Sequence, residues 1–332
     1  MPARPVAAPA VAGALAVVDP QVVRGLDEVA AEPSVVAVGF FDGVHRGHQT
    51  IIRRAVGAAQ EAGVRSVVVT FDRHPMEVVK PGSQPKLLMT LARRATTLAA
   101  QGVDLVVVLP FDDALRHLSP EAFVDHVLVE PLQARRVVVG ADFRFGHRAA
   151  GSVATLHELG AAAGFSAEGV TLLELDGVVI SSTAIRSALD AGDVELAARM
   201  LGRPPLVDGV IVRGDQRGAG LGYPTANLQT GRRVAVPAKG IYAGALELPD
   251  GVAHPCVTSV GVNPTFGGQE LRIEAHLLDF SGDLYGLRAG LDFRHRLRDE
   301  IRFDSVAELV AQMDADTAGA RRLLGLPARE GG

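Results

Sequence analysis

The residues best suited to chemistry in this chain begin with two histidines, His45 and His48, in a short glycine-containing stretch. The β-branched run 35–38 precedes them, and segment 49–62 carries apolar residues at helical spacing, so we predict a strand, a tight loop and a helix. Such a loop directs backbone N–H groups and the positive end of a helix dipole at one point, which favours phosphate. Because both imidazoles can donate hydrogen bonds there, the spacing predicts a phosphate site. For either histidine alone, surface polarity or helix capping would be the preferred interpretation.

A second polar group stands at the start of a later helical segment. Ser181 and Ser182 precede it, and Arg186 follows one turn inside. Taken alone, this pattern indicates an N-cap followed by a solvated arginine. Its significance therefore depends on whether the fold brings it to the histidine loop.

The elements that must position these residues alternate between β and α patterns. We predict strands at 66–71, 105–109, 137–139 and 170–175, and helices at 87–101, 119–128, 153–163 and 184–201. This alternation predicts a parallel sheet with helices on both faces. Ligands bind beyond the C-terminal ends of strands in such sheets, and the loops 40–48, 71–75 and 140–146 all lie at those ends. The three loops are therefore expected to form one pocket.

The character of the chain changes near Arg203, where two prolines indicate a linker. Beyond it, short β patterns at 243–248, 253–262, 271–277 and 287–293 favour a small antiparallel barrel. Ser305 and Glu308 form a capping box that opens one final helix. We expect a flexible tail over 1–16, an α/β domain over 17–202 and a barrel domain over 203–332.

A glycine-rich segment, 209–223, leads into Pro-Thr-Ala-Asn at 224–227. Glycines let backbone N–H groups approach a polyphosphate, and the neutral oxygens of Thr225 and Asn227 suit Mg²⁺ that is also bound by phosphate. An ordinary loop with a proline turn is the alternative for the glycines alone. Gly-Lys-Ser/Thr occurs nowhere, which excludes a P-loop enzyme.

Strict alternation over 271–277 places Glu274 on the opposite strand face from Ile273 and Ala275. Two interpretations of Glu274 remain at this point. A solvent-facing glutamate is the common one for such a position, and a general base is the alternative.

Composition excludes several classes of function. The chain has 332 residues, 48% of them hydrophobic, and a net charge of −5, so there is room for two cores and no electrostatic case for nucleic-acid binding. The single cysteine, Cys256, cannot form an internal disulfide; it fits a reducing cytoplasm and is expected in the core rather than as a nucleophile. We expect no signal peptide, since 1–16 lacks a basic region followed by an apolar core, and we find no apolar run long enough to cross a membrane.

Several motifs together carry a family resemblance. Residues 39–48 resemble the Gly-x-Phe-Asp-Gly-x-His-x-Gly-His signature of the nucleotidyltransferase superfamily, and 181–186 resemble its Ser-Ser-x-x-x-Arg segment. The glycine-rich loop with Pro-Thr-Ala-Asn, and the strand 274–280, resemble the corresponding motifs of riboflavin kinases. From about Val22 to Leu324, in the expected order, the chain resembles the bacterial bifunctional riboflavin kinase/FMN adenylyltransferases, also called FAD synthetases.

For the N-terminal half the resemblance implies a Rossmann-like nucleotidyltransferase domain in which FMN attacks the α-phosphorus of ATP, yielding FAD and pyrophosphate. His45, His48, Ser182 and Arg186 would stabilise the charge that develops on the phosphates. The implied ATP-binding residues are Gly39, Phe40, Asp42, Gly43, His45, His48, Ser181, Ser182 and Arg186. The implied flavin-side residues are Phe71, Pro75, Asp142, Phe143 and Phe145. Phe143 and Phe145 fit a hydrophobic core equally well.

For the C-terminal half the resemblance implies a barrel that phosphorylates riboflavin with ATP and Mg²⁺, with Glu274 accepting the proton of the ribityl hydroxyl. The implied ATP-binding residues are Gly214, Gly218, Gly220, Gly222, Thr225 and Asn227, of which Thr225 and Asn227 would also bind the metal. Arg298 would lie on the flavin side. The expected partners are riboflavin, FMN and ATP, without nucleic acid or membrane, and self-association is left open.

The departures from the family pattern are small. Phe40 stands where asparagine is frequent, Arg73 replaces a usual proline, and Tyr223 replaces a common phenylalanine. Three alternatives remain: a single-activity enzyme, another transferase of the His-x-Gly-His class such as a cytidylyltransferase, and a non-catalytic flavin-binding or regulatory protein. Intact motifs in both halves argue against each.

Overall fold

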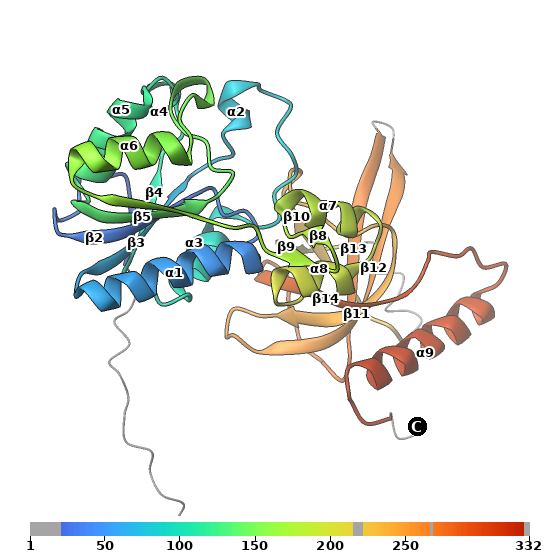
Figure 1. Ribbon diagram of the computed structural model, residues 1–332. Helices are drawn as coiled ribbons and strands as arrows, with labels where there is room; N and C mark the ends of the chain where they lie inside the picture. Colours follow the sequence, from blue (N-terminus) through green and yellow to red (C-terminus); the bar gives the residue numbers. More distant parts are fainter. Residues whose placement is uncertain (1–20, 215–221, 266–267, 329–332) are drawn as a thin grey trace, which may run out of the picture.

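An α/β domain lies beside a β-barrel in the computed structural model, which describes residues 21–214, 222–265 and 268–328 (Figure 1). The α/β domain contains a six-stranded sheet in the order β1-β4-β3-β2-β5-β6, and all its strand pairs are parallel. Its strands are β1 (Gln21–Arg24), β2 (Ser34–Val38), β3 (Arg65–Phe71), β4 (Leu105–Leu109), β5 (Ala134–Gly140) and β6 (Ser166–Val170). From β2 the chain proceeds to β3 and β4 on one side and then to β5 on the other, so β2 and β5 flank the switch point at which such sheets bind ligands.

Helices cover both faces of the sheet because the strands are apolar on both sides. In β2, Val35 and Ala37 pack with one helical layer, whereas Val36 and Val38 pack with the other. The first layer contains α1 (Arg46–Ala62) and α3 (Leu91–Ala99). The second contains α5 (Pro120–Phe123), the π-helix η1 (Val124–Val129) and α6 (Val153–Ala163). Three short pieces interrupt the loops: α2 (Met76–Val79), α4 (Asp113–Arg116) and the 3-10 turn η2 (His147–Ala149).

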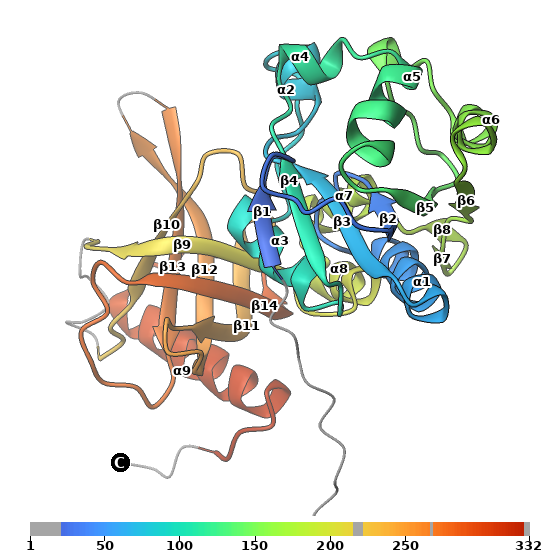
Figure 2. The ribbon, with the colours of Figure 1, turned by 90° about the vertical axis from the view of Figure 1, so that its left-hand side faces the viewer.

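The second domain is a closed antiparallel barrel in the order β10-β13-β12-β11-β14-β9. Its strands are β9 (Leu206–Val212), β10 (Ala226–Thr230), β11 (Gly240–Glu247), β12 (Ala253–Thr265), β13 (Gly268–Leu277) and β14 (Arg288–Arg298). Helix α9 (Val306–Leu323) begins at the predicted cap, where Ser305 Oγ accepts from the Glu308 N–H at 3.2 Å, and it lies along the outside of the barrel (Figure 2). Cys256 is fully buried in the barrel core, and burial raises the pKa of its thiol to about 12, so it is no nucleophile.

Two helices bridge the domains. Helices α7 (Ser182–Asp190) and α8 (Val194–Leu201) share one apolar cluster with the barrel, in which Ile185 and Met200 are buried with Tyr242 and Phe293. Polar contacts complete the interface: the guanidinium of Arg93, in α3, lies 2.7 Å from Asp208 of β9, and Leu87 forms a parallel bridge with Val234. In Figure 2, α3 lies between the sheet and the barrel.

The structure confirms the predicted parallel sheet and antiparallel barrel and corrects four elements. The helix predicted at 87–101 begins only after Thr90, whose hydroxyl caps it, because Leu87 pairs with Val234. The helix predicted at 184–201 is two helices, separated at Gly192, which has φ 76°, and Asp193, which caps α8. The strand predicted at 170–175 is the end of β6 followed by a hairpin of β7 (Glu174–Leu175) and β8 (Val178–Val179). The helix predicted to continue to Leu128 changes to π-helix at Val124. Strands β1, β9 and β10 were not predicted.

Candidate active sites

The loop between β2 and α1 holds the histidine pair in a constrained backbone. Phe41, Gly43 and Val44 all have positive φ, at 55°, 82° and 40°, and a buried β-branched residue is rare in that region. His45 caps α1, and its Nδ1 accepts from the His48 N–H at 3.3 Å. The two rings stack with centroids 3.5 Å apart. The loop therefore presents both imidazoles together at the N-terminus of α1, beside the switch point.

Both histidines are neutral at neutral pH. Burial, and secondarily Arg203 and Arg186, lower the pKa of His45 to about 4. Burial, together with His45 and Arg94, holds the pKa of His48 well below 6.5. Since His45 Nδ1 is an acceptor, the hydrogen of that neutral ring lies on Nε2. His48 Nδ1 is buried and finds no hydrogen-bond partner within the described chain. The pair is thus a set of uncharged donors in a preorganised place.

Arg186 reaches the same loop through Asp42. The Asp42 carboxylate is 2% exposed, accepts from the Leu88 N–H at 3.0 Å and lies 2.5 Å from Arg186. Burial raises the pKa of Asp42, and Arg186 and the Leu88 N–H oppose that shift. Ser182 Oγ donates to the Asp42 carbonyl at 2.9 Å, whereas Ser181 Oγ accepts from the Ala184 N–H as the N-cap of α7. The serine–arginine segment is therefore joined to the histidine loop, and Arg186 is ion-paired rather than solvated.

A cavity of about 290 Å³ opens above this loop. Of the residues expected to bind ATP, those in its wall are Gly39, His45, His48, Ser181 and Ser182, and Asp142 and Phe143 from the flavin side also line it. Phe40, Asp42, Gly43 and Arg186 are not in that wall. Gly43 faces the domain interface, where a Cβ would lie 2.7 Å from Leu88 Cδ1. The Phe40 ring instead contacts the ring of His74, with centroids 4.9 Å apart.

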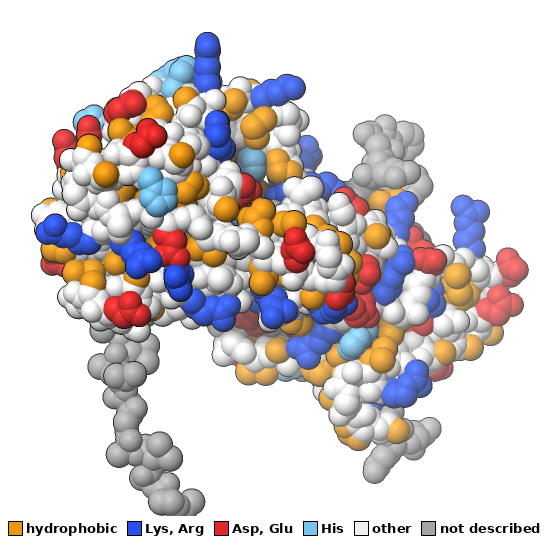
Figure 3. Space-filling view, viewed as in Figure 1, with side chains coloured by type: hydrophobic (Ala, Val, Ile, Leu, Met, Phe, Trp, Pro, Cys, Tyr) orange, Lys and Arg blue, Asp and Glu red, His pale blue; other side chains and the backbone are white. Residues whose placement is uncertain are grey.

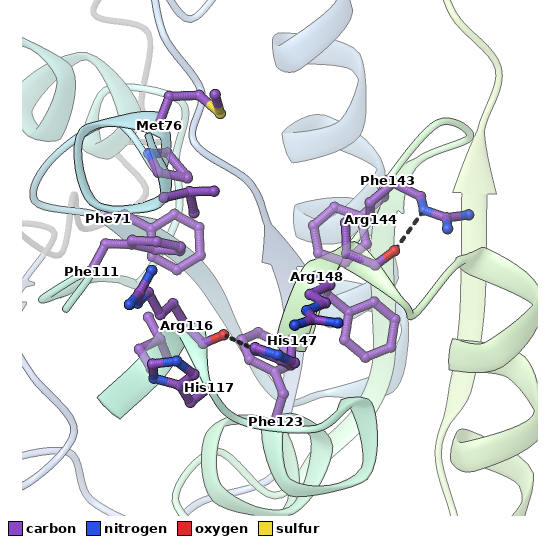
Figure 4. Close-up of a pocket in the computed structure, with 16 residues that line it drawn as sticks. Phe71, Met76, Phe111, Arg116, His117, Phe123, Phe143, Arg144, His147 and Arg148 are labelled. Atoms are coloured by element: carbon purple, nitrogen blue, oxygen red, sulfur yellow. Dashed lines mark hydrogen bonds between the residues drawn. The ribbon is translucent and has the colours of Figure 1, made fainter. Parts of the chain in front are cut away.

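A larger cavity of about 710 Å³ adjoins it, lined by the aromatic side chains of three strand-end loops (Figure 4). Phe71 and Phe111 lie on one side and Phe143 on the other, while Arg144 is turned outward to donate to the Ala149 carbonyl at 3.1 Å. The expected residues Phe71, Pro75, Phe143 and Phe145 all line it, and Phe145 is also 6% exposed in the core. Since Phe143 borders both cavities, the two spaces meet at this ring.

Two groups in this region were not predicted. Phe111 follows the end of β4, so the strand-end rule that identified the other loops points to it as well. Arg94 is 1% exposed, lies 4.1 Å from the Phe40 ring centroid and donates to the Phe71 carbonyl. Its Nε has no hydrogen-bond partner, it forms no ion pair within the described residues, and burial lowers its pKa to about 10. Its place on the apolar stripe of Leu91, Ala95 and Leu98 was the available sequence signal.

The barrel gathers a second set of residues on its outer face. Asn227 of β10 and Ser259 of β12 both pair with Glu274 of β13, and Thr225 Oγ1 donates to Glu274 Oε2 at 3.4 Å. Arg272 Nη1 lies 3.0 Å from the other oxygen. Burial along β13 follows the predicted alternation, with Ile273 and Ala275 inside the barrel. A carboxylate, a hydroxyl and an amide therefore converge at one place.

The remaining kinase-side residues are placed as follows. Gly214 lies directly over Asn227, since a Cβ there would be 2.4 Å from Asn227 Nδ2. Gly222 has φ 86°, and Gly218 and Gly220 lie outside the described residues. A cavity of about 230 Å³ between the barrel and α9 is lined by Thr225, Glu274 and Arg298. The guanidinium of Arg298 is held by Asp316 of α9 at 2.6 Å.

A parallel sheet with a histidine pair at its switch point, joined to a barrel with a glutamate beside a glycine-rich segment, defines a two-domain nucleotide-dependent transferase. The family model for FAD synthetase matches residues 27–184, and that for riboflavin kinase matches residues 201–324. A bifunctional riboflavin kinase/FMN adenylyltransferase from Pseudomonas fluorescens is 44% identical over 91% of this chain and 97% of its own length. Its counterpart from Escherichia coli K12 is 35% identical over 92% and 98%. The chain belongs to the bifunctional riboflavin kinase/FMN adenylyltransferase family, as its motifs indicated.

A solved structure extends the likeness to both domains. It is described as a macrolide-efflux protein from Streptococcus pneumoniae, is 32% identical, and superimposes with a TM-score of 0.83 over 91% of this chain and 99% of that one. Across residues 21–214, 222–265 and 268–328, no helix is both long and apolar enough to cross a membrane.

Proposed function

We propose that this enzyme makes FMN on the outer face of its barrel and converts FMN to FAD at the switch point of its sheet. The observation that carries the proposal is the neutral His45–His48 pair, set where the cavity above the loop meets an aromatic one. A phosphate at the histidines and a flavin ring among the phenylalanines would then meet near Phe143.

For adenylyl transfer, no covalent intermediate on the protein is needed. A phosphate oxygen of FMN attacks the α-phosphorus of ATP, the bond to the β-phosphate oxygen breaks, and pyrophosphate leaves. Charge builds on the phosphate oxygens during this step, and donors fixed in advance stabilise it without reorganising. We assign that role to the imidazole N–H groups and to the N-terminus of α1. Ser182 lines the same cavity, and Arg186 acts from beside the loop, through the Asp42 carboxylate.

Arg94 supports this assignment electrostatically. Arg94 lies between the Phe40 ring and the Phe71 carbonyl. Its charge acts on Asp42 and Asp72 and helps to lower the pKa of His48, so its potential reaches the histidine pair. We therefore propose that Arg94 contributes positive potential at the histidine pair.

For riboflavin phosphorylation, Glu274 would accept the proton from the ribityl hydroxyl as that oxygen attacks the γ-phosphorus of ATP. The bond from the γ-phosphorus to the bridging oxygen breaks, and ADP leaves. Phosphoryl transfer depends mainly on positioning and charge neutralisation, so the base must be held in place. Arg272 and Thr225 hold the two oxygens of Glu274. The cavity beside Arg298 and α9 would receive the flavin ring.

The residues near Glu274 fit Mg²⁺. This ion retains several waters and needs only one or two protein oxygens besides substrate phosphates. Thr225, directly before β10, and Asn227, two positions later within it, offer a hydroxyl and an amide oxygen. When bound, the ion would neutralise phosphate charge.

We further propose a division near residue 202, with the adenylyltransferase unit over 17–202 and the kinase unit over 203–332, and a cytoplasmic location without nucleic-acid or membrane partners. The net charge of −5 and the mixture of acidic and basic side chains on the face seen in Figure 3 support the absence of nucleic-acid binding. Self-association stays a prediction, and the molecular mass of the protein in solution tests it.

The direct test is to incubate the protein with riboflavin, ATP and Mg²⁺ and to separate the flavins by chromatography. We expect FMN to appear first and FAD to follow. FMN without FAD, no FMN from riboflavin although supplied FMN is converted to FAD, or flavin binding without turnover would each reject the proposal in favour of one of the alternatives above.

A further inference from the structure

The segment joining the domains reaches back to the histidine loop. Arg203 lies between the end of α8 and the start of β9. Its Nη2 donates to the Gly43 carbonyl at 2.6 Å, and its Nη1 donates to the Val44 carbonyl at 3.2 Å. Gln49 Nε2 also donates to the Val44 carbonyl, at 2.9 Å. Two consecutive carbonyls of the loop are therefore held by a side chain that belongs to the barrel side.

These carbonyls belong to the strained part of the loop. Gly43 and Val44 are consecutive residues with positive φ, and such a conformation is strained in a buried valine. It persists only where the surroundings enforce it. Hydrogen bonds from a charged donor are stronger than those from a neutral one, so the two from Arg203 can offset the strain. The Val44 carbonyl is part of the peptide group that leads into His45, so fixing its plane fixes where the imidazole begins.

Arg203 has no other partner that would explain its place. Within the described ranges it forms no ion pair, and its remaining hydrogen bond is to the Leu201 carbonyl at 3.4 Å. It lines the interface cavity together with Gly43 and Leu206. Its charge is close enough to His45 to contribute to the lowered pKa of that ring. A half-buried guanidinium that binds only backbone carbonyls is costly unless the geometry that it imposes is needed.

We propose that Arg203 is a positioning residue for adenylyl transfer: from the interdomain segment it fixes the Gly43 and Val44 carbonyls and so places His45 and His48 against the phosphates. The inference rests on the proposed role of the histidine pair. It also makes the first active site depend on a residue outside the α/β fold, whereas the barrel site at Glu274 makes no use of Arg203.

The test compares Arg203→Ala and Arg203→Lys with Arg93→Ala in the full-length enzyme. Arg93 is the matched control because it also joins the domains, through Asp208 and Glu247, but does not contact the loop carbonyls. For Arg203→Ala we expect kcat of FMN adenylylation to fall on the order of tenfold to a hundredfold, since small misplacements of catalytic groups have effects of this size. KM for FMN should change little, and riboflavin phosphorylation should be unchanged. Added guanidinium ion should restore part of the lost kcat.

Arg203→Lys keeps the charge and the aliphatic stem but cannot bind both carbonyls in the same way. We therefore expect a loss of adenylylation kcat between those of the wild type and Arg203→Ala. This variant replaces Arg203→Ala in the test if the alanine variant does not fold. Equal losses in Arg93→Ala and Arg203→Ala, unchanged adenylylation in Arg203→Ala, or a loss that guanidinium does not relieve would overturn the inference. His48→Ala, measured in parallel, distinguishes failure of the Arg203 inference from failure of the proposed function. Full FMN adenylylation in His48→Ala would reject the proposed function itself.

Discussion

His48 is the residue on which the adenylyl-transfer assignment most directly depends. It is half-buried and neutral, its ring stacks on His45, and it meets the Phe41 ring edge-on. A residue placed this way can stabilise phosphate charge as a fixed donor, without a change in its own protonation.

Replacing His48 with alanine should reduce FAD formation about a hundredfold or more, because one preorganised donor is removed from the transition state. FMN formation should continue, so FMN should accumulate when riboflavin is supplied. Chromatography of the flavins measures both rates in one assay. Parallel loss of both products would indicate misfolding or a shared site instead.

The depressed histidine pKa values also predict how stability depends on pH. The pKa of His45 is about 4 in the fold and about 6.5 when unfolded, so the unfolded chain binds more protons between these values. The contribution to stability is therefore complete above pH 6.5 and is lost as pH falls toward 4. His45→Asn keeps a capping acceptor for α1 and removes this titration. When the pH is lowered from about 7.5 to about 5, only the wild type loses this contribution, so the melting temperature of His45→Asn should fall less than that of the wild type. Equal decreases would contradict the assigned burial of His45.

Glu274→Gln tests the proposed base of the kinase site. Glutamine retains the size and hydrogen bonding of the side chain but cannot accept the proton, so riboflavin phosphorylation should fall about 10²–10⁴-fold. Adenylylation of supplied FMN should be nearly unchanged, and thermal melting should show an intact fold. Kinase turnover within a few-fold of wild type would mean that Glu274 is only a surface residue of β13.

Among the elements, α7 and α8 follow the α/β domain in sequence and pack on the barrel in space. Ile185, Leu189 and Met200 are at most 3% exposed and lie in the apolar cluster of the barrel. Each buried side chain of this kind contributes about 1.5–3 kcal/mol relative to exposure. The stability of the barrel therefore depends on helices that precede the expected boundary.

Two fragments make this measurable. A fragment from Arg203 to the C-terminus and one from Ile180 to the C-terminus should both phosphorylate riboflavin and make no FAD. The longer fragment should melt at a higher temperature, because it retains the apolar partners of the barrel. Equal melting temperatures would show that α7 and α8 are dispensable for the barrel, and a folded longer fragment without kinase activity would reject the independence of the two units.

The arrangement of the elements also shows which parts of the site the sequence can predict and which it cannot. Strand periodicity located the loops at 40–48, 71–75 and 140–146, and their positions at strand ends predicted that they would share a site. The placing of Phe40 and Asp42 at the nucleotide stays a prediction, and the sequence did not indicate that their side chains would contact His74 and Arg186. Arg203 has no local signal, since its partners lie about 160 positions earlier in the chain. Such contacts follow from how domains dock, which no local pattern encodes.

At the scale of the whole molecule, the two sites lie on different folds. The histidine pair faces a cavity of the α/β domain and Glu274 faces the outside of the barrel, and no residue lines both the cavity at His45 and the cavity at Glu274. FMN made at one site must therefore leave it before it is consumed at the other. Each step can then be removed without removing the other.

Mixing two inactive variants tests this account most directly. His48→Ala and Glu274→Gln are each incubated with riboflavin, ATP and Mg²⁺, alone and together, and FAD is measured by chromatography. We expect almost no FAD from either variant alone, FMN from His48→Ala, and FAD from the mixture, because FMN released by one variant is adenylylated by the other. Substantial FAD from either variant alone, or none from the mixture although FMN accumulates, would contradict the assignment of the two reactions to separate sites.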